Sequence, residues 1–242
     1  MEMKSIALFL FIVQAILNIV ILSEPFYADI FRCKKDSGSF LPNSTYENEL
    51  LTAFKTLSTF VRLGTDSART GQIYATSVCV GYLKIEACKS CVNNIIPLLL
   101  KSCPKIKQAF AWRSKCMVQY GPVRNVIAYD SWFFAHETSN IKVKDLGGLE
   151  KTMITLVEKL SEQAAYVDRN TKYAYGTMPY GSRQNLFMVM QCTTDIVPED
   201  CLKCLQVRVY GEMKSCCSGA TAAATLTSGC YMRYAHDDFR SR

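Results

Sequence analysis

Cysteine is the residue type in this sequence whose number and spacing could support chemistry. The chain has 242 residues, of which twelve are cysteines, and two of its segments have the spacing C-x8-C-x2-C. A C-x2-C pair occurs in zinc sites, in redox-active thiol pairs and in disulfide frameworks. The cysteines therefore allow three interpretations, and the cellular compartment bears on the choice between them.

The N-terminus indicates that the chain enters the secretory pathway. Residues 6–22 form an apolar run that is broken only by Gln14 and Asn18, which is typical of a signal peptide. We predict a signal peptide over residues 1–28, with cleavage between residues 23 and 28. The alternative is an uncleaved signal anchor, because a run of this length lies near the lower limit for a membrane span.

Structural disulfides are the interpretation that this compartment favours. Thiols do not stay reduced in an oxidising lumen, and no histidine accompanies either C-x2-C pair. A redox role would need such a pair on a βαβ scaffold, for which the sequence gives no sign. We expect no metal, no cofactor and, after removal of residues 1–28, no stable membrane anchor. The polar residues 231–242 argue against a glycosylphosphatidylinositol anchor.

An internal repeat organises the rest of the chain. Four cysteines recur with an offset of 113 residues and a fifth recurs with an offset of 114. The set Cys79, Cys88, Cys91, Cys103 and Cys116 is matched by Cys192, Cys201, Cys204, Cys216 and Cys230. The sequence therefore predicts two copies of one domain, over residues 29–134 and 135–242.

Each copy has the same predicted elements. Apolar residues at helical spacing predict a first helix, and Ser44-x-x-Glu47 forms a capping box before it in copy one. In the two copies the predicted segments are first helices 46–61 and 149–164, glycine-containing loops 64–71 and 176–181, strands 72–79 and 185–192, second helices 86–102 and 199–215, and strand-like regions 111–120 and 223–234. This order lacks βαβ spacing. It predicts an α+β fold of two tandem disulfide-stapled domains, each an antiparallel sheet with two helices packed on it.

The remaining polar residues form no known catalytic motif. The chain has two histidines, His136 and His236, and no G-x-S-x-G, H-E-x-x-H or phosphate-binding loop. We therefore expect a protein without enzymatic activity, in which both histidines are surface or packing residues. Removing residues 1–28 takes away one lysine and two glutamates, so that the net charge rises from +7 to +8. We expect the basic residues between positions 101 and 115 to be solvated, and the secretory route excludes nucleic acid as a partner.

The repeated C-x8-C-x2-C motif with its flanking cysteines resembles that of the plant cysteine-rich repeat secretory proteins, which contain two ginkbilobin-homologous (stress-antifungal) domains. The resemblance implies that the first cysteine of each domain pairs with the fifth, the second with the third and the fourth with the sixth. In this chain it implies the disulfides Cys33–Cys103, Cys79–Cys88, Cys91–Cys116, Cys192–Cys201 and Cys204–Cys230.

The second copy departs from this pattern in two places. The offset of 113 puts Leu146 at the position of Cys33, and an additional cysteine, Cys217, follows Cys216. The adjacent pair has three alternatives: a disulfide between the two residues, free thiols, or a bond to a second chain.

Some members of the family bind mannose and inhibit fungi. They use an Asn directly after the first cysteine, an Arg six residues before the last cysteine and a Glu five residues after it. The corresponding positions are Lys34, Phe110 and Gly121 in copy one and Gly147, Ala224 and Ala235 in copy two. Because none of the three residue types is present, the sequence argues against the mannose site of the family.

Two functional hypotheses follow from the resemblance. In the first, the protein is secreted to the apoplast and binds a cell-wall or microbial glycan in a defence, stress or lectin-like role. In the second, it is an interaction module for extracellular domains of related receptor kinases and has no sugar site; exposure of the aromatic residues 132–134 would favour this hypothesis. Asn43-Ser44-Thr45 is the one glycosylation sequon, and we expect a glycan on Asn43.

Overall fold

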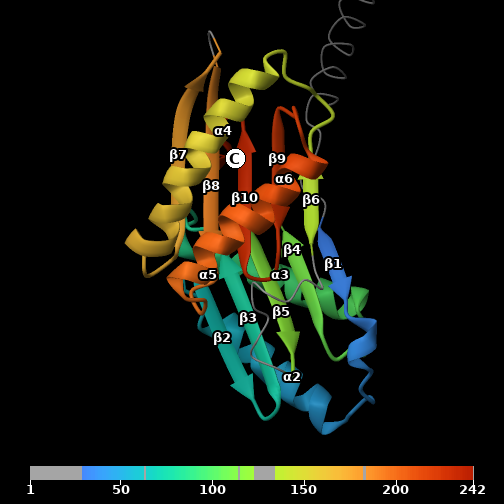
Figure 1. The fold of residues 1–242 in the computed structure, drawn as a ribbon. Helices are drawn as coiled ribbons and strands as arrows, with labels where there is room; N and C mark the ends of the chain where they lie inside the picture. The colour runs from blue at the N-terminus through green and yellow to red at the C-terminus, as the bar shows by residue number, and fades with distance from the viewer. Residues whose placement is uncertain (1–28, 63, 114, 123–133, 182–183, 242) are drawn as a thin grey trace, which may run out of the picture.

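The first half of the molecule is a five-stranded sheet with two helices (Figure 1). The computed structural model describes residues 29–241 except 63, 114, 123–133 and 182–183, so the predicted signal peptide, residues 1–28, lies outside the described residues. The elements are, in chain order, β1 (Ile30–Cys33), the 3-10 turn η1 (Lys35–Ser37), α2 (Thr45–Thr59), β2 (Thr65–Thr70), β3 (Ile73–Cys79), α3 (Ile85–Ser102), β4 (Ala109–Arg113) and β5 (Cys116–Gly121).

The second half repeats this order. Its elements are β6 (Ala135–Thr138), α4 (Leu146–Glu162), the π-helical turn η2 (Gln163–Val167), β7 (Tyr173–Tyr180), β8 (Gln184–Cys192), α5 (Pro198–Lys203), the π-helix η3 (Cys204–Val209), α6 (Tyr210–Cys216), β9 (Ala222–Leu226), β10 (Cys230–Ala235) and the 3-10 turn η4 (Phe239–Ser241). In the described part of the chain, no helix is both long enough and apolar enough to cross a membrane.

The two sheets have the same topology. The strand order is β1-β4-β5-β3-β2 in the first sheet and β6-β9-β10-β8-β7 in the second, and every neighbouring pair is antiparallel. The predicted α+β fold of two tandem domains is therefore confirmed.

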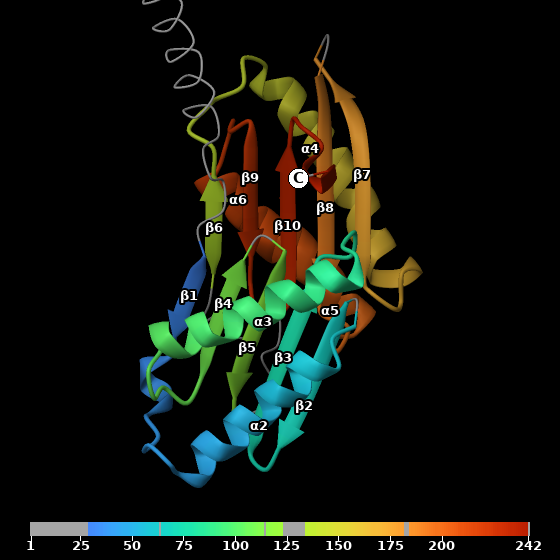
Figure 2. The same ribbon diagram turned by 180° about the vertical axis from the view of Figure 1, so that it is seen from behind.

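The helices of each half cover one face of its own sheet. Helix α2 begins where the Ser44 hydroxyl accepts a hydrogen bond from the Glu47 N–H at 3.3 Å, as the capping box predicted. Its buried residues Leu50, Ala53 and Leu57 recur every three or four positions and face the sheet. Figure 1 shows α4 and α6 in front of the second sheet, whereas Figure 2 shows α2 and α3 in front of the first. The two helical layers thus lie on opposite sides of the molecule.

The other faces of the two sheets pack against each other. Side chains of a strand alternate between its faces, and in β4 Ala109 and Ala111 join the core under the helices. Phe110 and Trp112 of the same strand join a third apolar cluster that also contains Leu226 of β9. Members of this cluster come from both sheets, so the central strands are buried on both faces.

Two predicted loops are strands in the structure. The glycine-containing loops expected at residues 64–71 and 176–181 are occupied by the edge strands β2 and β7. The sequence TDSART of β2 is polar because one side of an edge strand faces solvent; Asp66 and Ala68 are buried and Ser67 and Arg69 are exposed. The glycines in these segments therefore led to the wrong prediction.

The second helix of copy two contains a π-helical segment, whereas the second helix of copy one is α-helical throughout. The predicted helix over residues 199–215 is present as an unbroken helical run, but its middle part, Cys204–Val209, is π-helical and joins α5 to α6. A π-helical segment accommodates one additional residue in a helix without changing the positions of its ends. The extra residue also explains why the repeat offset changes from 113 to 114 between Cys204 and Cys230.

Candidate functional site

Disulfides hold the C-x2-C helix of the first half to its sheet. In the structure Cys79 pairs with Cys88, Cys91 with Cys116 and Cys33 with Cys103. The two cysteines of the C-x2-C motif therefore have different partners, one at the end of β3 and one at the start of β5. This arrangement fixes α3 across two neighbouring strands and leaves no thiol pair for zinc or for exchange.

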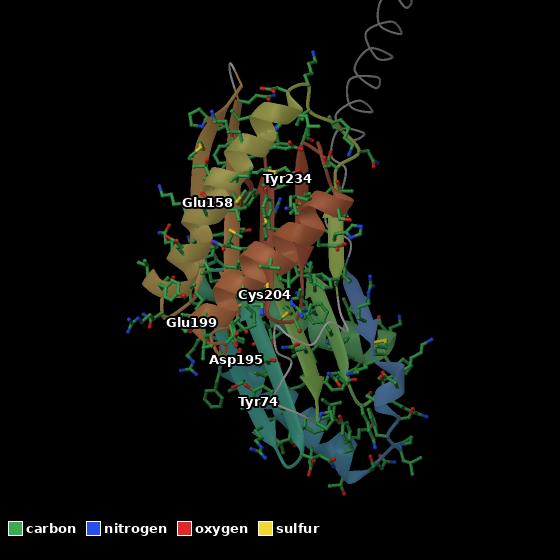
Figure 3. The ribbon with its side chains drawn as sticks, viewed as in Figure 1. Tyr74, Glu158, Asp195, Glu199, Cys204 and Tyr234 are labelled. Carbon is green, nitrogen blue, oxygen red and sulfur yellow. A yellow bond between two sulfur atoms is a disulfide. The ribbon has the colours of Figure 1, made fainter. Side chains whose placement is uncertain are left out.

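The second half has the same two bonds around its C-x2-C motif. Cys192 pairs with Cys201, and Cys204, at the start of η3 (Figure 3), pairs with Cys230 of β10. The remaining two cysteines, Cys216 and Cys217, pair with each other. All twelve cysteines of the chain are thus in disulfides in the structure.

Strand register identifies the equivalent positions of the two halves and corrects the sequence alignment. Cys33 lies opposite Ala109, whereas Thr138 lies opposite Ala223. Ala109 and Ala223 are equivalent because each pairs with a tyrosine at the same place on the next strand, Tyr120 or Tyr234. Thr138, not Leu146, therefore occupies the position of Cys33, and Leu146 lies instead at the start of α4.

The extra cysteine is Cys216 and not Cys217. Cys103 ends α3 and its N–H donates to the Leu99 carbonyl, while Cys217 ends α6 and its N–H donates to the Met213 carbonyl. Cys217 thus occupies the position of Cys103. Since Thr138 replaces the partner that Cys103 has, the structure pairs Cys217 with its neighbour.

The positions of the family mannose site lie largely in the interface between the sheets. Phe110, Ala224 and Ala235 belong to the apolar cluster shared by both halves and are 0%, 3% and 6% exposed. Gly121 is also buried. Gly147 lies on α4, and the corrected register puts Ser139, directly after Thr138, at the position of Lys34. Neither half therefore presents the three-residue mannose site to solvent.

Specific contacts hold this interface together. The Trp112 and Tyr231 rings lie 4.5 Å apart. The Gln191 side chain, 3% exposed, accepts from the Gly81 N–H at 3.1 Å and donates to the Cys79 carbonyl at 2.9 Å. No motif in the sequence marks these residues, although consecutive apolar residues in the strand segments are a signal of strands covered on both faces.

A polar cleft lies beside the start of α4 in the second half. Its volume is about 450 Å³. It is lined by Lys142, Asp145, Tyr180, Gln184, Thr221 and His236. The Tyr180 and His236 rings are in contact at 5.2 Å, and burial lowers the pKa of His236. Hydrogen-bonding groups of both kinds beside aromatic rings are suited to a polar ligand.

A second, mainly apolar groove of about 300 Å³ separates α4 from α6. Met153, Tyr210, Met213 and Cys217 line it, with Tyr234 of β10 between helices and sheet (Figure 3). Lys214 lies 4.8 Å from the centre of the Tyr210 ring. Burial and the nearby Glu150 and Glu158 carboxylates raise the pKa of the Tyr210 phenol.

The other residues singled out in the sequence lie in different parts of the structure and do not form one site. His136 Nδ1 is 3.4 Å from Glu212 Oε1 on α6, and His236 belongs to the polar cleft. Asn43 is exposed at the N-terminus of α2, where its N–H donates to Glu47 Oε2 at 2.6 Å. A glycan on Asn43 stays a prediction. Of the aromatic run, Phe134 is half-buried, and residues 132 and 133 lie outside the described residues.

Comparison with known proteins gives the same picture of a duplicated extracellular domain. The family model described as "Salt stress response/antifungal" matches residues 32–122 and 136–237. Cysteine-rich repeat secretory protein 38 of Arabidopsis thaliana is 28% identical over 210 residues, which cover 84% of this chain and 82% of that protein. Cysteine-rich receptor-like protein kinase 27 of the same plant is 27% identical over 208 residues, 84% of this chain and 32% of the kinase. The chain thus spans about a third of the length of that relative.

Solved structures share the fold of both halves. The tandem DUF26 ectodomain of the Arabidopsis thaliana cysteine-rich receptor-like protein PDLP8 superposes with a TM-score of 0.71 at 19% identity, covering 87% of this chain and 97% of that one. That of PDLP5 superposes with a TM-score of 0.63 at 22% identity, covering 86% and 98%. Since both halves match the family model, the chain belongs to the salt stress response/antifungal family and contains two copies of its domain.

Proposed function

We propose that the protein is secreted to the apoplast and acts there, without enzymatic activity, as an interaction module for extracellular domains of related receptors. The observation that carries this proposal is the burial of the mannose positions, which disfavours the sugar-binding role of the family. Phe110, Ala224 and Ala235 are apolar and lie in the interface between the sheets. A sugar could reach them only if the two halves separated.

The kinds of relatives also support a protein partner. The chain matches a secreted protein over most of that protein's length and a receptor-like kinase over about a third of the kinase. Copies of one fold commonly associate through self-complementary surfaces, and a secreted protein with the extracellular fold of a receptor carries the same kind of surface. We place such pairing in defence or stress responses, as the family description suggests.

Binding to a panel of related tandem ectodomains tests this proposal. The purified secreted protein would be immobilised and titrated with each ectodomain by biolayer interferometry, at low and at moderate salt. We expect saturable binding to a subset that persists at moderate salt, because binding that depends only on the +8 charge is screened. Loss of all binding at moderate salt would contradict the proposal.

The polar cleft supports a second candidate, a lectin-like role in which this cleft, and not the mannose site of the family, binds a glycan. The cleft combines Asp145, Gln184 and Thr221 with the Tyr180 and His236 rings. A screen of neutral and acidic cell-wall oligosaccharides, with mannan as control, tests it. If the glycan binds in the cleft, Gln184→Ala abolishes its binding, whereas Gln72→Ala, on the turn between β2 and β3 of the other half, leaves it unchanged.

A further inference from the structure

We propose that reduction of the Cys216–Cys217 disulfide creates a zinc site from Cys216, His136 and Glu212. The proposal goes beyond the binding role above and does not depend on it. It begins from the one disulfide that has no counterpart in the first half. Thr138 replaces the cysteine at the position of Cys33, so Cys217 pairs with the extra residue Cys216.

This disulfide differs from the others in what it constrains. The other five join residues that are 9 to 70 positions apart, and cross-links of this kind stabilise a fold by restricting the unfolded chain. The Cys216–Cys217 bond joins neighbours and therefore closes no loop of the chain. Its reduction leaves five cross-links in place, so the two sheets and their helices are retained.

The two other ligand residues already lie beside Cys216. Glu212 and Cys216 are four residues apart on α6, which puts them on one face of the helix. His136 reaches this face from β6, and Figure 1 shows β6 next to α6. One ligand atom from each residue lies within 4.8 Å of the other two. His136 Nδ1 and Glu212 Oε1 are in contact at 3.4 Å.

These three groups are a zinc ligand set. Zinc binds thiolate, imidazole and carboxylate at about 2.0–2.3 Å, with a water as the fourth ligand in open sites. Ligand atoms around such an ion are about 3.3–3.8 Å apart, so the cluster must contract by about 1 Å. Release of the Cys216 side chain from the disulfide supplies the rotation that this contraction needs. While the disulfide is intact, Cys216 has no thiolate to offer.

The site is accessible to solvent. The side chains of His136 and Glu212 are 47% and 32% exposed, and Cys216 is half-buried whereas Cys217 is 1% exposed. A low-molecular-weight thiol can therefore reach the Cys216 sulfur, and a metal ion can follow it.

The reaction consumes two equivalents of such a thiol. The first thiolate attacks the Cys216 sulfur, forms a mixed disulfide and releases the Cys217 thiolate, which takes a proton. The second thiolate attacks the sulfur of the first, so that the two reductant molecules leave as their own disulfide and Cys216 leaves as thiolate. Two electrons pass from the reductant to the protein. Zinc then binds the Cys216 thiolate together with His136 and Glu212.

Two serine variants separate this site from an unspecific thiol effect. Cys217→Ser leaves Cys216 as the single free thiol without any reductant, and Cys216→Ser leaves Cys217 as the single free thiol. Zn²⁺ binding would be measured by calorimetry, and Co²⁺ would be used as a spectroscopic probe of thiolate ligation. Mass spectrometry establishes for each variant that the other five disulfides are intact.

We expect one zinc per chain for Cys217→Ser, with thiolate-to-cobalt charge-transfer absorption, and none for oxidised wild type or for Cys216→Ser. Adding His136→Ala to Cys217→Ser should weaken zinc binding at least about tenfold, the effect of losing a ligand or its support. His236→Ala, in the polar cleft, is the matched control and should have no effect. Equal zinc binding by the two serine variants would overturn the proposal, as would retention of affinity in the His136→Ala variant.

Wild-type protein gives an independent test that needs no cysteine variant to fold. Limited treatment with a phosphine reductant, followed by alkylation and peptide mapping, identifies which sulfurs are freed first. We expect Cys216 and Cys217 to be alkylated before the others and zinc uptake to rise in proportion to their reduction. Release of another disulfide first, or zinc uptake that does not follow reduction of this pair, would contradict the proposal.

Discussion

Buried tyrosines fix the strand after the last cysteine at equivalent places in the two halves. The Tyr120 hydroxyl donates to the Ile106 carbonyl at 2.8 Å, and the Tyr234 hydroxyl donates to the Ala220 carbonyl at 2.9 Å. Burial raises the pKa of both phenols. Tyr46 closes the same region of the first half with a hydrogen bond from its hydroxyl to the Lys107 carbonyl. Each of these groups has to stay protonated in the native state.

Tyr46 leads to a prediction for alkaline pH. Burial and the Glu49 carboxylate raise the pKa of Tyr46 from 10.0 to about 12 in the native state. Between these two values the native state holds a proton that the unfolded chain has lost, so its free energy of unfolding falls as the pH rises from 10. We expect urea unfolding midpoints to decrease between pH 9 and pH 11. The Tyr46→Phe variant should show a shallower decrease, and equal slopes would contradict this account.

The residues around Asn43 separate glycosylation from helix capping. The Asn43→Gln and Thr45→Ala variants should both lose the mass of one glycan, since each destroys the sequon. Ser44→Ala should keep the glycan and lower the free energy of unfolding by about 1 kcal/mol, because the Ser44 hydroxyl caps α2. Intact-mass spectrometry and urea unfolding of protein secreted from plant cells provide the measurements. If wild-type protein carries no glycan, the expected modification of Asn43 is wrong, and residues 43–45 act only in capping α2.

At the scale of elements, the halves differ in the winding of the helix that carries the C-x2-C motif. Twelve residues lead from Cys91 to Cys103 along α3, and thirteen lead from Cys204 to the equivalent Cys217. The π-helix over Cys204–Val209 absorbs the additional residue, so the disulfide at one end and the helix cap at the other keep their places. Cys217 therefore ends α6 as Cys103 ends α3, and Cys216 is the additional residue.

A deletion tests this explanation. Removing Val207, which is 63% exposed in the π-helix, should convert this segment to α-helix with the span found in the first half. We expect the variant to form its disulfides and to melt at or above the temperature of wild type. Removing Asn93 from α3 is the control. There each residue contributes about 100° of rotation, so the deletion should turn the buried face of α3 away from the sheet and prevent native pairing of Cys103. Failure of the Val207 deletion to fold would contradict our interpretation of the π-helix.

At the scale of the whole molecule, the interface between the sheets makes one unit from two domains. The Trp112 and Tyr231 rings are in contact across it, Gln191 bridges to Cys79 and Gly81, and the Thr194 N–H donates to Thr65 Oγ1 at 2.9 Å. Gly81 has no alternative, because a Cβ at this residue would lie 2.4 Å from the Tyr173 ring. The same interface covers the mannose positions and closes them to solvent.

Truncation of Trp112 should uncouple the halves. Trp112 is 4% exposed within the shared cluster, and removal of such a side chain costs about 3–5 kcal/mol. We expect a single calorimetric transition for wild type and two resolved transitions for Trp112→Ala, since each half retains its own core and its C-x2-C disulfides. Phe60→Ala, at a side chain that is 69% exposed, should leave the melting profile unchanged. A single, uniformly shifted transition for Trp112→Ala would mean that the halves do not fold independently.

The amino-acid sequence by itself determined the duplication, the α+β class and the location of the long helices. These properties follow from local information: cysteine spacing, the 3.6-residue period of apolar side chains and the capping residues before α2. The resemblance of the cysteine motif to that of the family also implied the pairing of five disulfides. None of these inferences required knowledge of which strands lie side by side.

Only the tertiary structure decided the register and the interface. The offset between equivalent residues is 105 at Thr138, 113 at Cys204 and 114 at Cys217, and a constant offset therefore assigned Leu146 and Cys216 to wrong positions. Backbone hydrogen bonds between strands set equivalence, and such long-range pairing leaves no local period in the sequence. The edge strands β2 and β7 were missed because one of their sides is solvated. The burial of Phe110 and Ala224 depends in the same way on a sheet that lies more than a hundred residues away in the chain.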